Sequence, residues 1–274
     1  LNTTDNNTGV GYRALYLTTT GHSNTALGRS ALQACTTGDS STAIGTYALL
    51  NSTTGAKNTA TGYAALVSCT TGYNNTSLGY DSCYNLTTGY YNTAIGYQTL
   101  MIGTGFVGCT AAGYQALYNN TQGYNTAFGF QASLANTGGG ENCTFGSQAG
   151  YALTTGSNNV AMGSNALFTR TTGSDTTAIG HHALRLLTSG NGNAALGAYS
   201  GRALTTGNDN TFIGYYSGYD QTTGSNNTFV GSNSGSDITG GYDNTFIGRV
   251  AGYSETTGYQ NTAVGKECLK SING

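Results

Sequence analysis

The sequence has no proline and no tryptophan, and only 7% of its 274 residues are charged. A typical soluble domain has about 25% charged residues. The nine lysines and arginines are scattered, whereas binding to a nucleic-acid backbone needs clustered cations. No apolar run approaches the roughly 18 residues of a membrane span. We therefore expect no nucleic-acid partner and no membrane span.

Low charge with 44 glycines can indicate disorder, but other features of the composition oppose that interpretation. Disordered chains have few aromatic residues and a high net charge. This chain has 21 tyrosines, 8 phenylalanines and a net charge of −2, and Asn and Thr fill its polar positions. It therefore has apolar material to bury.

A 17-residue repeat runs through the whole sequence and is marked by the glycine that ends each NTAIG-like string. This glycine defines repeat position 0. The step between successive glycines is 17 residues in fourteen of fifteen cases, and the step from Gly113 to Gly129 is 16. The series is Gly11, Gly28, Gly45, Gly62, Gly79, Gly96, Gly113, Gly129, Gly146, Gly163, Gly180, Gly197, Gly214, Gly231, Gly248 and Gly265. A fixed period of this length is typical of solenoid proteins.

Three further columns keep their register along the chain. Position 8 is Thr in all fifteen full repeats, from Thr19 to Thr256, position 10 is Gly in fourteen, and position 13 is Asn in thirteen of sixteen. Stacked coils would align these residues as ladders, in which amide side chains hydrogen-bond along the stack. The predicted ladders include Gly28, Gly45, Gly62, Gly79, Asn24, Asn58, Asn75, Asn92, Thr36, Thr53, Thr70 and Thr87.

The predicted fold is an all-β parallel β-solenoid, or β-roll, of about sixteen 17-residue coils that forms one array over residues 1–274. Seventeen residues hold two short strands and two turns, and one coil cannot bury a core without its neighbours. We expect an irregular coil near residues 103–124, where the short step falls and Phe106 replaces the position-10 glycine.

The side-chain pattern also predicts which residues face inward. Alternate positions 14 and 16 share one face, and Cys143, Val160 and Ala194 replace Thr at position 14, which suggests that this face is buried. The Thr-Thr-Gly segment is expected to be a turn in which glycine supplies a positive φ.

Residue sizes at positions 4 and 15 vary in a compensating way. Most coils have Leu at position 4, but three late coils combine Phe at position 15 with Gly at position 4: Phe212 with Gly218, Phe229 with Gly235 and Phe246 with Gly252. Close packing conserves volume. We therefore expect positions 4 and 15 to touch.

The string NTAIGYQTL, from Asn92 to Leu100, and its fifteen relatives resemble the SVAIG-type repeats in the heads of trimeric autotransporter adhesins. They also resemble NTAIGYQAL…TTG repeats of phage tail-fibre and related surface proteins. The resemblance covers nearly the whole chain. It implies a parallel β-roll, often trimeric, in a fibre at a cell or virion surface.

Candidate reactive groups do not form a catalytic or metal-binding set in the sequence, so we expect no enzyme activity and no cofactor. The six cysteines are expected to be buried and unpaired, because Cys35 and Cys69 share a column but lie two coils apart. His181 and His182 are expected to point to opposite faces, as neighbouring strand residues do. The carboxylates form no repeated pair.

Aromatic residues recur at position 1 and offer a candidate partner surface. Tyr63, Tyr80, Tyr97 and Tyr114 occupy it in successive coils, followed by Phe130. Stacked aromatics can bind sugars, or they can stabilise the β surface. Glycosylation sequons occur at Asn51, Asn74, Asn75, Asn85, Asn119, Asn142 and Asn226, among other positions.

These observations favour a structural subunit or shaft segment of an extracellular fibre or filament, which would self-associate end to end or as a homotrimer. One alternative is an adhesin or phage tail-fibre segment that binds cell-surface glycans. Another is an ice-binding solenoid, which needs an exposed face of parallel Thr ranks, whereas position 14 is expected inside. The chain starts and stops within a coil without a cap, so we expect either a fragment or ends that neighbours cover.

Overall fold

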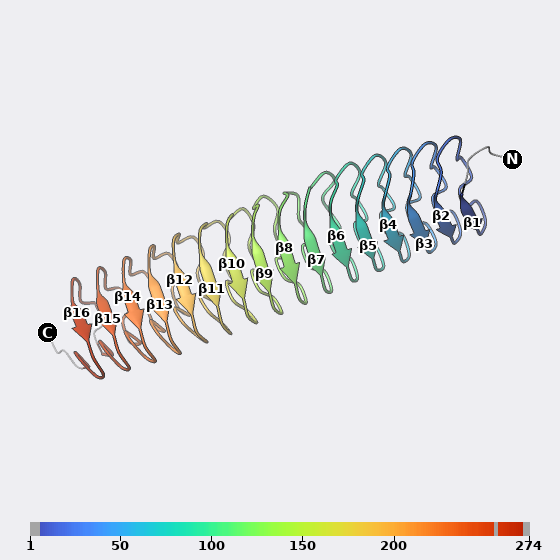
Figure 1. The fold of residues 1–274 in the computed structure, drawn as a ribbon. Helices are drawn as coiled ribbons and strands as arrows, with labels where there is room; N and C mark the ends of the chain where they lie inside the picture. Colours follow the sequence, from blue (N-terminus) through green and yellow to red (C-terminus); the bar gives the residue numbers. More distant parts are fainter. Residues whose placement is uncertain (1–5, 255–256, 271–274) are drawn as a thin grey trace. The chain divides into compact units, whose positions relative to one another are not determined.

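A computed structural model describes residues 6–254 and 257–270. The chain is an all-β parallel solenoid, as predicted, with sixteen three-residue strands about 17 residues apart and no helix among the described residues. It divides into two compact units, residues 1–138 and residues 139–274. In each unit the chain advances by one coil per repeat (Figure 1).

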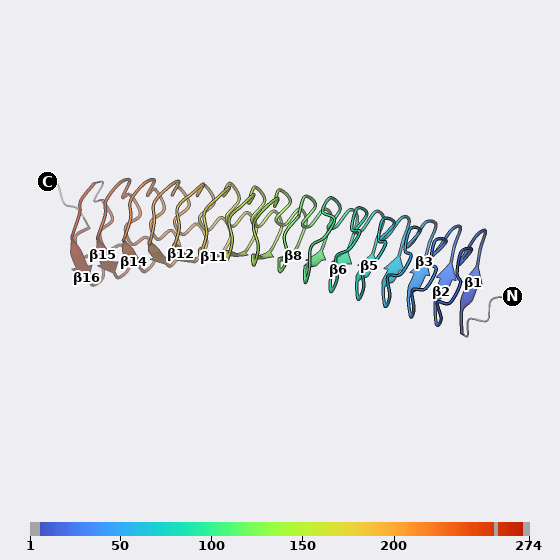
Figure 2. The ribbon, with the colours of Figure 1, turned by 90° about the horizontal axis from the view of Figure 1, so that it is seen from above.

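The first unit contains eight strands that pair in parallel, each with the next strand in the sequence. Equivalent residues of successive repeats lie opposite each other, as Ala43 does with Ala60. Figure 2 shows the same order from above. The strands are β1 (Thr8–Val10), β2 (Thr25–Leu27), β3 (Thr42–Ile44), β4 (Thr59–Thr61), β5 (Thr76–Leu78), β6 (Thr93–Ile95), β7 (Thr110–Ala112) and β8 (Thr126–Phe128).

The second unit repeats this arrangement with eight further strands in parallel register. They are β9 (Cys143–Phe145), β10 (Val160–Met162), β11 (Thr177–Ile179), β12 (Ala194–Leu196), β13 (Thr211–Ile213), β14 (Thr228–Val230), β15 (Thr245–Ile247) and β16 (Thr262–Val264).

The strands face the opposite way from the prediction. In β3 the central residue Ala43 is fully buried, while Thr42 is partly exposed and Ile44 is exposed. The same alternation holds from β2 to β16, so position 15 faces the core and positions 14 and 16 face outward. The prediction was wrong because Cys, Val and Ala replacing Thr fit an outward strand surface as well as an inward one.

Among the described residues, the remainder of each coil contains no second strand, which also differs from the prediction. Positions 2 and 4 adopt left-handed dihedrals, as in Tyr47 (φ 63°) and Leu49 (φ 51°). Their backbone groups still bond to the next coil, for example Leu49 N–H to Ala65 O at 3.0 Å. This alternation of handedness turns the chain while it keeps the hydrogen bonds between coils.

The core of each coil is built where positions 4 and 15 meet. Phe229 is fully buried, and a Cβ added to Gly235 would lie 2.6 Å from its Cδ2 atom. Where position 4 is Leu, as in Leu49, position 15 is a small residue such as Ala43. The predicted contact therefore exists, and it lies within one chain.

The irregular coil lies where it was expected, and a second volume exchange accounts for it. Phe106 is 2% exposed, and a Cβ on Gly103 would lie 2.8 Å from the Phe106 ring. The ring therefore fills the space that a position-7 side chain occupies elsewhere.

The missing residue of the 16-residue step is absorbed in the turn after Thr121. Tyr124 N–H still bonds to Val107 O at 2.8 Å, and Thr126 of β8 still pairs with Thr110 of β7. The turn shortens without changing the strand register.

Candidate functional site

A column of buried asparagines at position 13 forms a hydrogen-bonded ladder in each unit. Asn58 Nδ2 donates to Gly72 O at 2.7 Å in the next coil. Asn75 donates its backbone N–H and its Nδ2 to Asn58 Oδ1, at 3.0 and 3.1 Å. The column comprises Asn24, Asn58, Asn75, Asn92 and Asn125 in the first unit and Asn142, Asn159, Asn193, Asn210, Asn227 and Asn244 in the second. Asn75 Nδ2 also donates to Gly89 O at 2.9 Å, so this amide joins its own coil to both neighbours.

Glycine is required at two repeat positions because the backbones of successive coils approach each other closely there. Gly28, Gly45, Gly62 and Gly79 at position 0 have φ values of 131° to 143°, and a Cβ at any of them would overlap the carbonyl of the next glycine. The position-10 glycines have no positive φ, so the predicted reason for them was wrong. A Cβ on Gly55 would lie 2.5 Å from Gly72 O, and this approach excludes a side chain.

The position-8 threonines form a second ladder, which runs through the backbone. Thr36 Oγ1 donates to Thr53 O at 3.1 Å, and Thr53 Oγ1 donates to Thr70 O at 3.1 Å. Thr70 and Thr87 continue the series. Each hydroxyl therefore bonds to a carbonyl of the next coil instead of another hydroxyl. Thr256, the last member of the column, lies outside the described residues.

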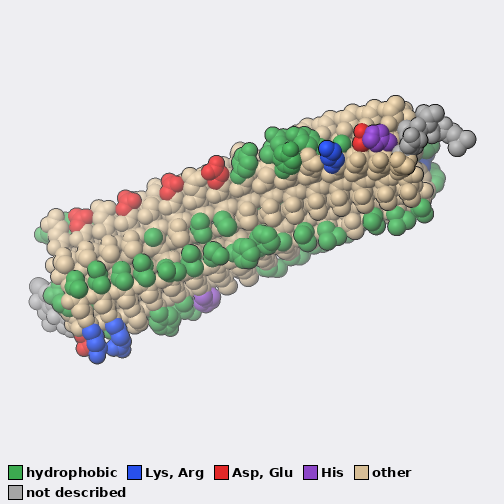
Figure 3. All heavy atoms as spheres, viewed as in Figure 1, with side chains coloured by type: hydrophobic (Ala, Val, Ile, Leu, Met, Phe, Trp, Pro, Cys, Tyr) green, Lys and Arg blue, Asp and Glu red, His purple; other side chains and the backbone are tan. Residues whose placement is uncertain are grey.

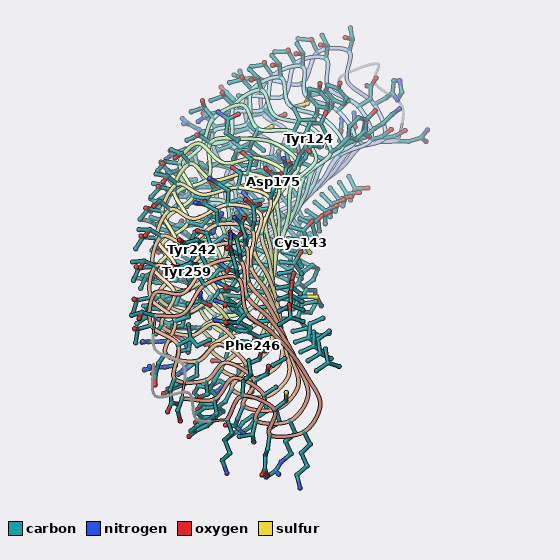
Figure 4. The ribbon with its side chains drawn as sticks, turned by 90° about the vertical axis from the view of Figure 1, so that its left-hand side faces the viewer. Tyr124, Cys143, Asp175, Tyr242, Phe246 and Tyr259 are labelled. Carbon is teal, nitrogen blue, oxygen red and sulfur yellow. The ribbon has the colours of Figure 1, made fainter. Side chains whose placement is uncertain are left out.

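The position-1 aromatics stack on one another in the first unit. Ring centroids are 4.9 Å apart for Tyr63 and Tyr80, 5.5 Å for Tyr80 and Tyr97, and 5.3 Å for Tyr97 and Tyr114. Interplanar angles do not exceed 16°. Because the faces cover one another, the rings present mainly edges and hydroxyls. This geometry supports a stabilising ladder more than a platform on which sugars stack. Tyr242 and Tyr259 form a similar pair at position 11 in the second unit, 5.2 Å apart (Figure 4).

The outer face of each sheet carries a rank of exposed apolar side chains at position 16. In the first unit Ile44 is 38% exposed and Val10 is 56% exposed; in the second Ile213 is 39% exposed and Val264 is 65% exposed. Rows of hydrophobic side chains are visible on the molecular surface in Figure 3. Beside this rank lie the outward position-14 residues, all threonine in the first unit.

The two adjacent histidines come together, contrary to the prediction. Their ring centroids are 3.9 Å apart, and Tyr199 of the next coil lies edge-on to both, at 5.1 and 5.3 Å. His181 and His182 belong to the turn after β11, and His182 has a φ of 59°. Strand alternation therefore does not apply to them.

This histidine pair belongs to a cationic and aromatic cluster on three successive coils of the second unit. Tyr216 is 5.0 Å from Tyr199 and 4.5 Å from Tyr219. Arg202 lies over the Tyr219 ring at 5.4 Å. Sequence reasoning missed this cluster, although alignment of the repeats places Arg185 and Arg202 at position 5 of consecutive coils.

Burial lowers the pKa of His182, and His181, Arg185 and Arg202 lower it further. The unfolded chain therefore binds this proton more tightly than the folded chain. We expect stability to fall as the pH drops below about 6.5 towards the lowered pKa. Melting temperatures at pH 7.5 and pH 5 measure the effect, which His182→Gln should reduce. An unchanged pH dependence in that variant would contradict the assignment.

Arg170 is a second unexpected cation, and it is fully buried at position 7 between Leu153 and Leu187 of the neighbouring coils. Its Nε donates to Gly173 O at 2.8 Å and its Nη2 to Ser174 O at 3.1 Å, while Nη1 has no partner. Burial lowers the pKa of Arg170 to about 10, and Asp175 partly opposes this.

Replacing Arg170 with leucine should raise the free energy of unfolding by about 2 kcal/mol, because a buried charge gives way to an apolar side chain. Gly173 O keeps its hydrogen bond from Asn159 Nδ2, and Ser174 O keeps one from Thr176 Oγ1. Urea denaturation measures the change. Arg170→Ala, which leaves a cavity, is the control and should give a smaller gain or none. A less stable leucine variant would show that the guanidinium stabilises the coil.

The six cysteines are free, as expected, but Cys143 and Cys268 are only partly buried, contrary to the expectation. Burial raises the pKa of Cys69 and of Cys109 to about 11, so both thiols stay protonated at neutral pH. Among the described residues no three His, Cys, Asp or Glu side chains come together as metal ligands. No helix in residues 6–254 and 257–270 could span a membrane.

The sequons differ in accessibility. Asn75 and Asn142 are buried in the asparagine ladder, whereas Asn51 and Asn226 are exposed. Asn51 and Asn226 can therefore be reached by a modifying enzyme without opening the coil, whereas Asn75 and Asn142 cannot.

No protein-family model matches this chain, and none of the curated proteins matches its sequence.

Proposed function

We propose that the chain is a structural subunit or shaft segment of an extracellular fibre, built by the stacking of repeat coils. The observation that supports this most is the same hydrogen-bond set repeated from coil to coil. Asn75 bonds to Asn58 as Asn227 bonds to Asn210, through both the backbone N–H and the side-chain amide. Such an array extends by whole coils without any new kind of contact.

Self-association of copies through the outer sheet face follows from the exposed position-16 rank. Large exposed apolar patches on soluble proteins mark interaction surfaces. The face is regular and its strands contain no charged side chain. A second copy, which presents the same regular rank, would cover it without burying an unpaired charge. The resemblance to trimeric surface fibres agrees with this arrangement.

Immunogold electron microscopy of the source cells or particles tests the proposal. We expect label along thin surface fibres. Purified protein should associate at high concentration, and Ile95→Lys on the outer face should weaken that association. Gln98→Lys, which adds the same charge at position 2, is the matched control. Label confined to the cell interior, or equal association of both variants, would contradict the proposal.

Ice binding is a second candidate, because the argument against it depended on position 14 being buried. In the first unit the position-14 residues of all eight repeats, from Thr8 to Thr126, are threonines on the outward face. The neighbouring rank is mostly aliphatic, and a flat regular face of this kind can order water. Inhibition of ice recrystallisation measures this activity. Thr76→Lys should abolish it while Thr71→Lys, on the turn, should not. If the purified chain does not inhibit ice recrystallisation, ice binding is excluded.

A further inference from the structure

Two arginines of the second unit lie side by side in successive coils and are flanked by aromatic rings. Arg185 lies over the Phe168 ring, with Cζ 5.3 Å from its centroid, and Arg202 lies over Tyr219 at 5.4 Å. All four residues occupy position 5, so the column reads aromatic, cation, cation, aromatic. A guanidinium stacked on a ring keeps its N–H fork free at the edge.

The described part of the chain provides no counter-ion for these guanidinium groups. Neither forms an ion pair with a carboxylate in residues 6–254 and 257–270. Asp220 directly follows Tyr219, but its side chain is exposed and forms no ion pair with Arg202. Two adjacent cations without a carboxylate are unusual in a chain that has nine Lys and Arg residues among 274.

Two buried nitrogen atoms of the cluster also lack partners. Arg185 Nε and His182 Nδ1 are inaccessible to solvent and make no hydrogen bond to any residue that the structure describes. A buried polar group without a partner is unfavourable, and the great majority of such groups in folded proteins are bonded. Because solvent cannot reach these two atoms, a ligand would accept hydrogen bonds from the other N–H groups of Arg185, whose side chain is partly exposed.

The surrounding rings define what kind of anion would fit. Tyr199, Tyr216 and Tyr219 are partly exposed, and Tyr215 is exposed. Their hydroxyls can exchange hydrogen bonds with sugar hydroxyls, and their apolar edges can pack against sugar C–H groups. A nucleic-acid backbone would need a longer track of cations than two residues.

We infer that the cluster formed by His181, His182, Arg185, Tyr199, Arg202, Tyr215, Tyr216 and Tyr219 is a binding site for an acidic saccharide, whose sulfate or carboxylate groups the two arginines hold. Arginine binds such planar or tetrahedral anions through two parallel N–H donors. This inference goes beyond the shaft role and does not depend on it, because a single copy of the chain contains the complete site.

Calorimetry with the full chain at about 0.15 M salt, where long-range charge effects are screened, tests the site. The probes are a sulfated heparin hexasaccharide, neutral maltohexaose and inorganic sulfate. We expect the heparin fragment to bind and the neutral sugar not to bind. Inorganic sulfate should bind at least tenfold more weakly than the fragment.

Two variants that each remove the same number of charges distinguish binding at this site from general electrostatic attraction. Arg185→Gln with Arg202→Gln should weaken binding at least tenfold. The control, Arg13→Gln with Arg29→Gln, removes two exposed arginines that also lie over tyrosine rings, in the first unit. It should change affinity less than twofold. If the double glutamine variant does not fold, Arg185→Lys with Arg202→Lys keeps the charge and should still weaken binding by loss of the N–H fork.

The inference would be overturned by no binding of the heparin fragment, by equal losses in the two glutamine variants, or by sulfate binding as tight as that of the fragment. Binding of an acidic peptide such as hexaglutamate with the affinity of the saccharide would also overturn it. None of these results would affect the shaft proposal, which is tested by location and association.

Discussion

Replacing Gly231 with alanine should lower the free energy of unfolding by more than about 4 kcal/mol. This glycine has a φ of 130°, where an L-residue is strained by about 1–3 kcal/mol. Its added Cβ would also lie 2.5 Å from Gly248 O and 2.6 Å from the carbonyl carbon, in the next coil. Both atoms belong to the backbone, so relief would require the two coils to separate. Urea denaturation of the purified variant measures the loss.

Gly265→Ala provides a matched control in the same unit. Gly265 has the same φ of 130°, but no described atom lies within 4 Å of its added Cβ. It should therefore show the dihedral strain alone, about 1–3 kcal/mol. The difference between the two variants measures the close approach of the coils. Equal losses would show that the backbone dihedral, not the spacing between coils, requires glycine at position 0.

Replacing Phe229 with alanine should cost about 3–5 kcal/mol, the usual effect of removing a buried aromatic side chain. Phe229 is fully buried and stacks on Phe246, with ring centroids 5.2 Å apart and an interplanar angle of 8°. Its loss therefore leaves a cavity and also removes a contact with the next coil. Chemical denaturation monitored by circular dichroism measures the change.

A second substitution should recover part of that stability. Gly235→Leu alone should destabilise the chain, because its Cβ would lie 2.6 Å from Phe229 Cδ2. In the Phe229→Ala background the same leucine should fill the cavity. The left-handed φ of Gly235, 56°, is tolerated by Leu184, which has a φ of 47°. Gly252→Leu, which faces Phe246, is the control and should give no recovery. If both leucines act alike, positions 4 and 15 pack independently.

Features that depend on repetition were predictable from the sequence. The coil length, the parallel register and the side-chain bonds of Asn58 to its neighbours follow from residues that recur every 17 positions. The contact between Phe229 and Gly235 was predictable from compensating sizes at two positions. Each of these needed only the alignment of repeats and close packing, without a backbone conformation.

Two features could not be predicted from the sequence: which face of each strand is buried, and the cationic cluster. Both depend on backbone dihedral angles, which composition does not reveal. Ala43 points inward because left-handed residues such as Leu49 turn the chain and bring a large side chain beneath it. His181 and His182 converge because His182 is left-handed. Left-handed φ was expected only at glycine, whereas Leu and His adopt it here through the bonds between coils.

The short sequence separation of the residues that bond between coils determines how the chain can fold. Thr36 bonds to Thr53 and Asn58 to Asn75, each 17 residues away. That separation is about 0.06 of the 274-residue chain, below the contact order of about 0.07–0.12 that is typical of fast-folding helical bundles. Most all-β proteins must close long loops before their strands pair. Here a nucleus of a few coils can form anywhere and grow by one repeat at a time, so the chain can fold progressively while its remaining residues are still being made.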